Sequence, residues 1–143
     1  MLRTRYIVAA ALLVAAGPAL AKEVITVVEH ADTDAVVDIG AKDDSVGDVL
    51  TFANPVFDAA NKTQLGTDQG YCIRTVVGKA WECVWTLSLK DGQITVEGPF
   101  LDAGDSVMAV TGGTGKYSGA RGQMKLHSRN PKGTEFDFRY ELE

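Results

Sequence analysis

The sequence is short and acidic: it has 143 residues, a formal net charge of −5 and 45% hydrophobic residues. A chain of this length can form one domain around a single core. Its negative charge argues against nucleic acid or an anionic membrane surface as a partner.

The N-terminal segment has the features of a secretory signal peptide. Arg3 and Arg5 supply positive charge, residues 6–16 form an apolar run, and residues 19–21 provide a small-x-small cleavage pattern. The apolar run is shorter than the about 20 residues needed to cross a bilayer. The sequence therefore predicts a signal peptide at 1–21 and a mature domain at 22–143, exported to the periplasm or the exterior of a bacterial cell.

The mature part consists of short segments with alternating apolar and polar residues, each ended by Gly, Pro, Asn or Asp. Helical periodicity is almost absent. The predicted strands are 24–29, 48–57, 67–76, 80–89, 93–101, 105–110, 122–128 and 134–142, with a weaker one at 35–39. Eight short strands in a chain of this length are typical of a sandwich or an up-and-down barrel, so the fold class is all-β.

The alternation also predicts which side chains face inward. One face of segment 80–89 carries Trp81, Cys83, Trp85 and Leu87, and segment 134–142 presents an apolar face that includes Tyr140. An eight-stranded barrel can be filled by such side chains, or it can leave room for one small ligand.

Cys72 and Cys83 flank a predicted hairpin turn. If the turn centres on Val77 and Gly78, the two cysteines oppose each other across the strand pair, close enough for a disulfide. Export to an oxidising compartment favours this bridge. The alternative is a pair of reduced thiols, one of which is reactive.

Several motifs that would indicate other chemistry are incomplete. The glycine-rich stretch at 111–122 is not a phosphate-binding loop, because Val110 replaces the first glycine and Tyr117 follows Lys116. We expect these glycines to provide positive φ or a close backbone approach in a long loop between strands. His30 and His127 are the only histidines, and His127 is expected on a solvated face, so no metal site is predicted.

Four blocks, at residues 46–54, 66–72, 93–100 and 109–123, occur in the order found in the plant allene oxide cyclase family. The last block is also similar to the signature of dirigent proteins. This resemblance, from about residue 46 onward, implies an eight-stranded antiparallel barrel that is commonly trimeric, with an apolar cavity at one end and no cofactor. Proteins of this kind act by holding a flexible apolar molecule in one conformation.

The resemblance also assigns roles to individual residues. Asn54 matches an asparagine that helps to hold a water near the reacting oxygen, and Cys72 matches a pocket cysteine. Phe100 stands where the family has a tyrosine, and Trp85 falls on an aromatic position of the same wall. We expect Trp85, Phe100 and Tyr140 to contact a ligand, with Arg74 and Asp68 as polar members of the site.

The first strand can be aligned in two ways. One alignment places Thr26 and Val28 at the family's functional glutamate and asparagine, whereas a shift of three residues makes Glu29 the acidic group. Glu29 and Asn54 are the candidate catalytic residues of a cofactor-free isomerase or cyclase.

The leading hypothesis is a barrel that binds an apolar small molecule and steers its cyclisation or coupling. The alternative is a structural or interaction barrel with a filled core.

Overall fold

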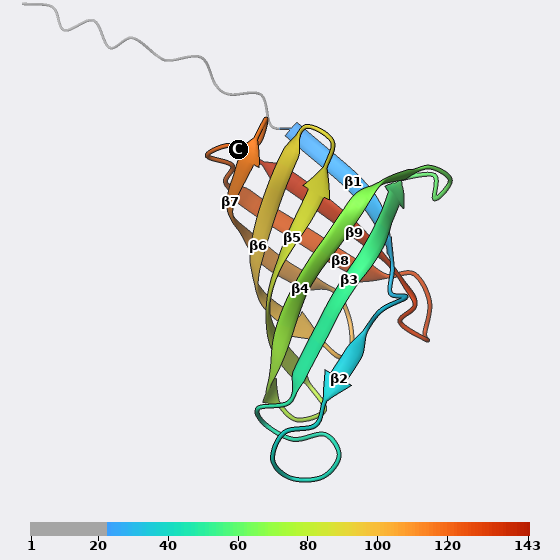
Figure 1. The fold of residues 1–143 in the computed structure, drawn as a ribbon, viewed down its shortest axis with the longest axis vertical. Helices are drawn as coiled ribbons and strands as arrows, with labels where there is room; N and C mark the ends of the chain where they lie inside the picture. The colour runs from blue at the N-terminus through green and yellow to red at the C-terminus, as the bar shows by residue number, and fades with distance from the viewer. Residues whose placement is uncertain (1–22) are drawn as a thin grey trace, which may run out of the picture.

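The computed structural model describes residues 23–143, and the predicted signal peptide lies outside these residues. The described chain is built from β-strands joined by turns and, between β2 and β3, by a longer loop (Figure 1). The strands are β1 (Glu23–His30), β2 (Ala35–Val37), β3 (Val49–Asp58), β4 (Gln64–Val76), β5 (Ala80–Leu89), β6 (Gly92–Leu101), β7 (Ser106–Gly115), β8 (Gly122–Ser128) and β9 (Glu135–Leu142). No helix in this part of the chain is long and apolar enough to cross a membrane.

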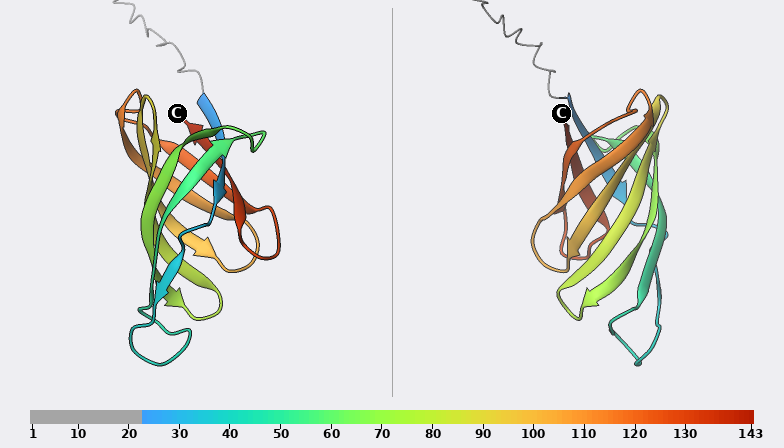
Figure 2. Two further views of the ribbon diagram at one scale, coloured as in Figure 1. Left: turned by 45° about the vertical axis from the view of Figure 1, so that its right-hand side comes forward. Right: turned by 90° about the vertical axis from the view of Figure 1, so that its left-hand side faces the viewer.

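The sheet closes into a barrel because β1 pairs with two strands. Each strand from β3 to β9 is antiparallel to the next, and β1 pairs with β9 along its whole length and with β3 at Val27–Glu29. Eight strands therefore form the closed wall. Two rotated views show how the sheet curves round on itself (Figure 2). The short β2 lies beside the first half of β3 as an additional strand. The predicted eight-stranded antiparallel barrel is confirmed, and the sandwich is excluded.

The alternation along the strands sorts apolar side chains into the barrel. Directly paired residues of neighbouring strands project to the same side of a sheet. The inward-facing side chains of one strand therefore lie beside those of the next, all around the barrel. The buried core includes Val27, Val56, Trp81, Leu87, Ile94, Val96, Met108, Met124, Phe138 and Tyr140. The predicted inner faces of β5 and β9 are both confirmed.

The glycine-rich stretch is where the strand prediction was wrong. Instead of ending at residue 110 and giving way to a loop, β7 continues to Gly115 and pairs with the start of β6. A side chain at Gly113 would put its Cβ 2.4 Å from the Tyr117 carbonyl oxygen and 2.7 Å from that of Gln93. The glycine therefore permits a close backbone approach that a larger residue would prevent.

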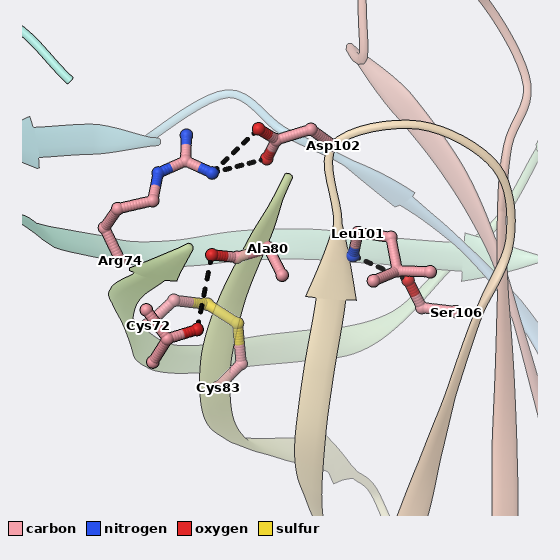
Figure 3. Close-up of a disulfide and its surroundings, with 8 residues drawn as sticks. Cys72, Arg74, Ala80, Cys83, Leu101, Asp102 and Ser106 are labelled. Atoms are coloured by element: carbon pink, nitrogen blue, oxygen red, sulfur yellow. Dashed lines mark hydrogen bonds and ion pairs between the residues drawn. A yellow bond between two sulfur atoms is a disulfide. The ribbon is translucent and has the colours of Figure 1, made fainter. Parts of the chain in front are cut away.

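The predicted disulfide is present. Cys72 on β4 and Cys83 on β5 are direct partners in the ladder and are joined by an S–S bond, drawn in Figure 3. The hairpin register that the sequence predicted is therefore confirmed, and neither cysteine is a free thiol. A disulfide fits an oxidising destination for the protein.

Candidate functional site

A narrow chamber lies inside the barrel. Its volume is about 40 Å³. The chamber is lined by Glu29, Asp34, Leu50, Phe52, Cys72, Trp85, Phe100, Leu126, Phe136 and Phe138. Phe100, Leu126 and Phe136 also line a hollow between the β6–β7 and β8–β9 turns, so the chamber opens toward that end of the barrel.

The chamber walls are mostly aromatic. The rings of Trp85 and Phe138 stack with their centroids 5.4 Å apart, and Phe52 meets Trp85 edge-on at 5.8 Å. Phe100 and Phe136 form a second edge-to-face pair at 6.0 Å. Such walls favour apolar or aromatic molecules.

Two acidic side chains, Glu29 and Asp34, interrupt this apolar surface. Glu29 pairs with Val56 on β3 and with Phe136 on β9, and all three face the interior. Its Oε1 accepts a hydrogen bond of 2.7 Å from the Nδ2 of Asn54. The Glu29 side chain therefore points into the barrel beside Asn54.

Asn54 also ties the loop after β1 to the site. Its Nδ2 donates to Asp34 Oδ1 at 2.8 Å, and its Oδ1 accepts from the backbone N–H and the hydroxyl of Thr33, both at 2.9 Å. The amide is fully buried and all its hydrogen-bonding groups are used. Asn54 therefore holds the two chamber carboxylates, Glu29 and Asp34, close to each other.

The surroundings of Glu29 favour its protonated form. Burial raises the pKa of this carboxyl from 4.5 to about 7; the hydrogen bond from Asn54 opposes the shift, and the charge of Asp34 adds to it. A carboxyl group with a pKa close to neutrality can both accept and donate protons under physiological conditions. Glu29 is therefore suited to proton transfer inside the chamber.

A second carboxyl group lies deeper in the barrel. Asp68 on β4 is the direct ladder partner of Asn54 and is completely buried. Burial is the main cause that raises its pKa to about 9, and the neighbouring Glu29 adds to the shift. Asp68 is therefore protonated at neutral pH. Tyr140 is also fully buried, and burial raises its pKa as well.

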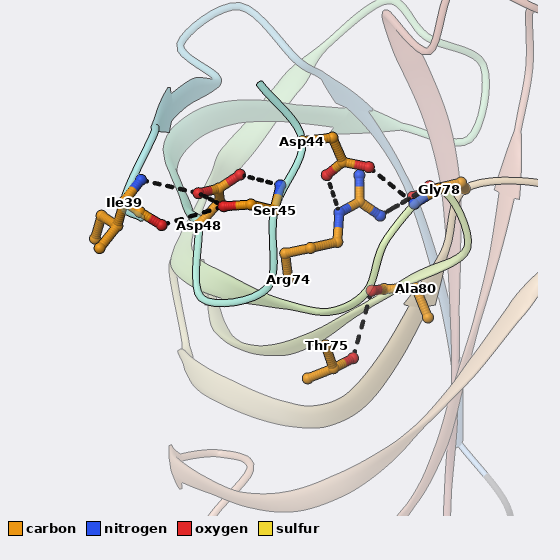
Figure 4. Close-up of polar contacts among 9 residues, drawn as sticks. Ile39, Asp44, Ser45, Asp48, Arg74, Thr75, Gly78 and Ala80 are labelled. Carbon is orange, nitrogen blue, oxygen red and sulfur yellow. Dashed lines mark hydrogen bonds and ion pairs between the residues drawn. The ribbon is translucent and has the colours of Figure 1, made fainter. Parts of the chain in front are cut away.

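Arg74 lies outside the chamber, contrary to the expectation that it contacts a ligand. Its Nε bonds Asp44 at 2.6 Å, its Nη1 bonds both oxygens of Asp102, and its guanidinium stacks 3.9 Å from the Trp81 ring (Figures 3 and 4). These two carboxylates hold the side chain at the end of the barrel. Arg74 therefore joins the loop before β3 to the β6–β7 turn.

The loop at residues 38–48 depends on a few polar contacts. Asp44 also accepts a hydrogen bond from the backbone of Gly78, and Asp48 accepts from the backbones of Ile39 and Ser45 (Figure 4). Asp44→Asn should weaken the ion pair with Arg74 and make amide hydrogens of residues 38–48 exchange severalfold faster. Because such partly exposed pairs contribute little, global stability should fall by less than about 1 kcal/mol.

Hydrogen-exchange mass spectrometry of this peptide measures the effect. The matched control is Asp43→Asn in the same loop, whose side chain bonds no other residue among the contacts described above. Equal exchange in the two variants and the parent protein would show that Asp44 does not hold the loop.

Sequence reasoning found some of the site and missed the rest. Trp85, Phe100, Cys72 and Glu29 line the chamber, and Asn54 donates a hydrogen bond to Glu29. Asp68 and Tyr140 are fully buried and do not line it. The missed lining residues are Asp34, Leu50, Phe52, Leu126, Phe136 and Phe138. Phe52 could have been found from its alternation with Asn54, whereas Asp34 lies in a loop with no periodic signal.

The fold and the chamber together define a small closed β-barrel with an acidic group in an aromatic interior. The chain belongs to the allene oxide cyclase family, whose sequence profile matches residues 22–130. The sequence-based resemblance to this family is confirmed.

Solved structures with the same fold carry several different activities. The chain is similar to a pyocyanin demethylase, with 26% identity and a TM-score of 0.75 over 85% of this chain and 100% of the other. It is also similar to a pterocarpan synthase dirigent protein, with 16% identity, a TM-score of 0.71, and coverage of 86% and 94%. A Diels–Alderase from Streptomyces koyangensis shares 14% identity and a TM-score of 0.63, with coverage of 90% and 72%. At these identities the last two show the fold alone.

Proposed function

We propose that this protein is exported, binds an apolar small molecule in the barrel chamber and steers its cyclisation or another rearrangement without a cofactor. The observation that carries the proposal is the Glu29 carboxyl, which faces an aromatic chamber and is held by Asn54 at 2.7 Å. A filled structural core would not need a buried acid with a pKa of about 7 at its cavity wall.

The chamber and Glu29 have separate tasks in this mechanism. The ring pairs around Trp85 and Phe100 restrict the conformations of the bound molecule, which lowers the entropic part of the barrier. Glu29 accepts a proton from the bound molecule or returns one to it. Asn54 fixes the position of the carboxyl group and balances part of its negative charge.

The names of the structural neighbours support a small-molecule reaction. They are a demethylase that acts on pyocyanin, a synthase of a pterocarpan and a catalyst of a Diels–Alder reaction. We infer that this chain acts on a molecule of comparable character, with apolar rings or conjugated double bonds.

Tryptophan fluorescence tests the proposal. In a Trp81→Phe protein the signal comes from Trp85, the only other tryptophan in the sequence and a member of the chamber wall. Pyocyanin, linoleic acid and coniferyl alcohol serve as probes. We expect at least one of them to quench this signal in a saturable way, because the ligand must lie against the indole ring.

Three variants then separate binding from catalysis. Leu126→Phe reduces the chamber and should weaken binding at least about tenfold, whereas Val107→Phe on the exposed face of β7 should not. Glu29→Gln keeps the shape and should leave binding within a fewfold of the parent, while slowing any conversion detected by mass spectrometry about a hundredfold or more. If no probe binds, or if Leu126→Phe has no effect, the chamber is not a ligand site.

A further inference from the structure

Three side chains separate the chamber from a larger space outside it. Phe100, Leu126 and Phe136 line both the chamber and the hollow between the β6–β7 and β8–β9 turns. The chamber has a volume of about 40 Å³, whereas the hollow has a volume of about 590 Å³. These three side chains therefore form a neck between a small inner space and a large outer one.

The chamber is too small to hold a ring in the conformation that the structure shows. A closed apolar cavity of about 150 Å³ is known to bind benzene. A volume of about 40 Å³ has room for only a few water molecules. A ligand that contains a ring can therefore reach Glu29 only if part of the chamber wall moves.

One aromatic side chain of the wall has free space on its outer side. The rings of Trp85 and Phe138 stack on each other in the buried core, where close packing leaves little room for another rotamer. Phe136 differs from them because it borders the hollow. A Cβ at Gly133, which lines the hollow, would lie 3.5 Å from the Cζ of Phe136. Because glycine has no side chain, nothing at this position hinders an outward rotation of the Phe136 ring.

The backbone on both sides of the neck is held in place. In the β8–β9 turn, the Oδ1 of Asn130 accepts hydrogen bonds from the backbone N–H groups of Lys132 and Thr134, at 3.1 and 3.3 Å. Across the β6–β7 turn, the backbone N–H of Leu101 donates to the buried hydroxyl of Ser106 at 2.9 Å. Opening of the neck is therefore a rotation of side chains and requires no movement of the turns.

Two aromatic rings meet across the neck. Phe100 and Phe136 are in edge-to-face contact, with their centroids 6.0 Å apart. Phe136 is also the direct ladder partner of Glu29, so the neck lies next to the acid. We propose that Phe100 and Phe136 form a gate, which joins the chamber to the hollow when the rings rotate outward and limits the width of the molecule that reaches Glu29.

This inference rests on the proposed function and narrows the class of substrate. The molecule enters by a thin end, such as a single ring or an unbranched chain, and this end reaches Glu29. The rest of the molecule stays in the hollow, which is large enough for it. A fused ring system as wide as two rings side by side is excluded from the chamber.

Acrylamide quenching tests the gate without any ligand. In the Trp81→Phe protein the fluorescence comes from Trp85, which lines the chamber and is 3% exposed. Phe136→Ala should raise the quenching constant severalfold, because acrylamide can then pass from the hollow to the indole ring. The matched control is Phe57→Ala on the outer face of β3, which should leave the quenching constant close to that of the parent protein.

Two phenols of different width test the selection of ligands by isothermal titration calorimetry. Para-cresol has one ring, whereas 2-naphthol has two fused rings and the larger apolar surface. The larger surface alone would make 2-naphthol bind more tightly. We expect the opposite order in the parent protein, with para-cresol roughly tenfold tighter, because forcing an extra ring into a packed site is unfavourable. Phe136→Ala should remove this preference, and Phe57→Ala should keep it.

The outcomes separate the gate from the proposed function. Circular dichroism verifies that each variant is folded, and leucine replaces alanine in any variant that is not. If Phe136→Ala and Phe57→Ala are quenched alike, or if 2-naphthol binds the parent protein as tightly as para-cresol, Phe100 and Phe136 do not form a gate, even though the chamber binds a ligand. If Phe136→Ala increases quenching but no phenol and no larger probe binds, the neck opens as described and the proposed function is wrong.

Discussion

Replacing Glu29 with glutamine should make the protein more stable at alkaline pH and reduce the dependence of its stability on pH. The reason is the cost of an ionised carboxyl inside an apolar barrel. Asp68→Asn should act in the same direction, because burial raises the pKa of both carboxyl groups. Most substitutions of buried residues destabilise a protein, so a gain in stability here would be specific evidence for these two acids.

The direction in which stability changes with pH follows from proton linkage. Between the unfolded pKa and the raised folded pKa, the folded state binds more protons than the unfolded state, so stability falls as pH rises. For Glu29 the window runs from 4.5 to about 7. At about 1.4 kcal/mol per pKa unit, this group alone accounts for a loss of roughly 3 kcal/mol across the window. The raised pKa of Asp68 extends the loss of stability toward pH 9.

Urea unfolding at about pH 5 and about pH 8 measures the effect. The parent protein should be clearly less stable at the higher pH, and Glu29→Gln should lose a large part of that difference. Glu97→Gln, on the exposed face of β6, is the matched control and should behave like the parent. A parent protein that is equally stable at both pH values would show that neither carboxyl has a raised pKa.

Removing the disulfide should destabilise the barrel by about 3 kcal/mol, the value expected when a cross-link closes a loop of this length in the unfolded chain. The bridge joins residues that are 11 positions apart in the sequence and links the neighbouring strands β4 and β5. Loss of this amount is a large part of the stability of a small domain. The Cys72→Ala/Cys83→Ala protein should therefore unfold at a markedly lower urea concentration.

A reducing agent provides the control for this experiment. It should lower the stability of the parent protein toward that of the double variant and leave the double variant unchanged. Equal stability of the oxidised parent and the double variant would show that the bridge contributes nothing. Because Cys72 also lines the chamber, ligand binding in the double variant should be measured separately.

Much of the wall could be predicted from the sequence. The alternation in β5 and β9 gives the inner face directly, since a strand has a period of two and one of its faces is buried. The turn at Gly78 fixed the hairpin register and with it the pairing of Cys72 with Cys83. Both features depend on neighbours that are close along the chain.

The features that could not be predicted from the sequence depend on contacts between distant segments. The extension of β7 to Gly115 depends on a close approach to β6 that no local signal reveals. Arg74 alternates correctly with Cys72, but Asp44 and Asp102, from two separate loops, hold its guanidinium at the barrel end. The inward position of Glu29 is set by the pairing of β1 with both β3 and β9, which are distant in the sequence.

The proposed function depends on Glu29 being a buried carboxyl with a pKa close to neutrality. Carbon-13 NMR of protein labelled at the glutamate side chains measures this directly, and the Glu29→Gln variant assigns the resonance. One glutamate carboxyl should titrate near pH 7, well above the ordinary value of 4.5. A spectrum in which every glutamate titrates near its ordinary pKa would contradict the account.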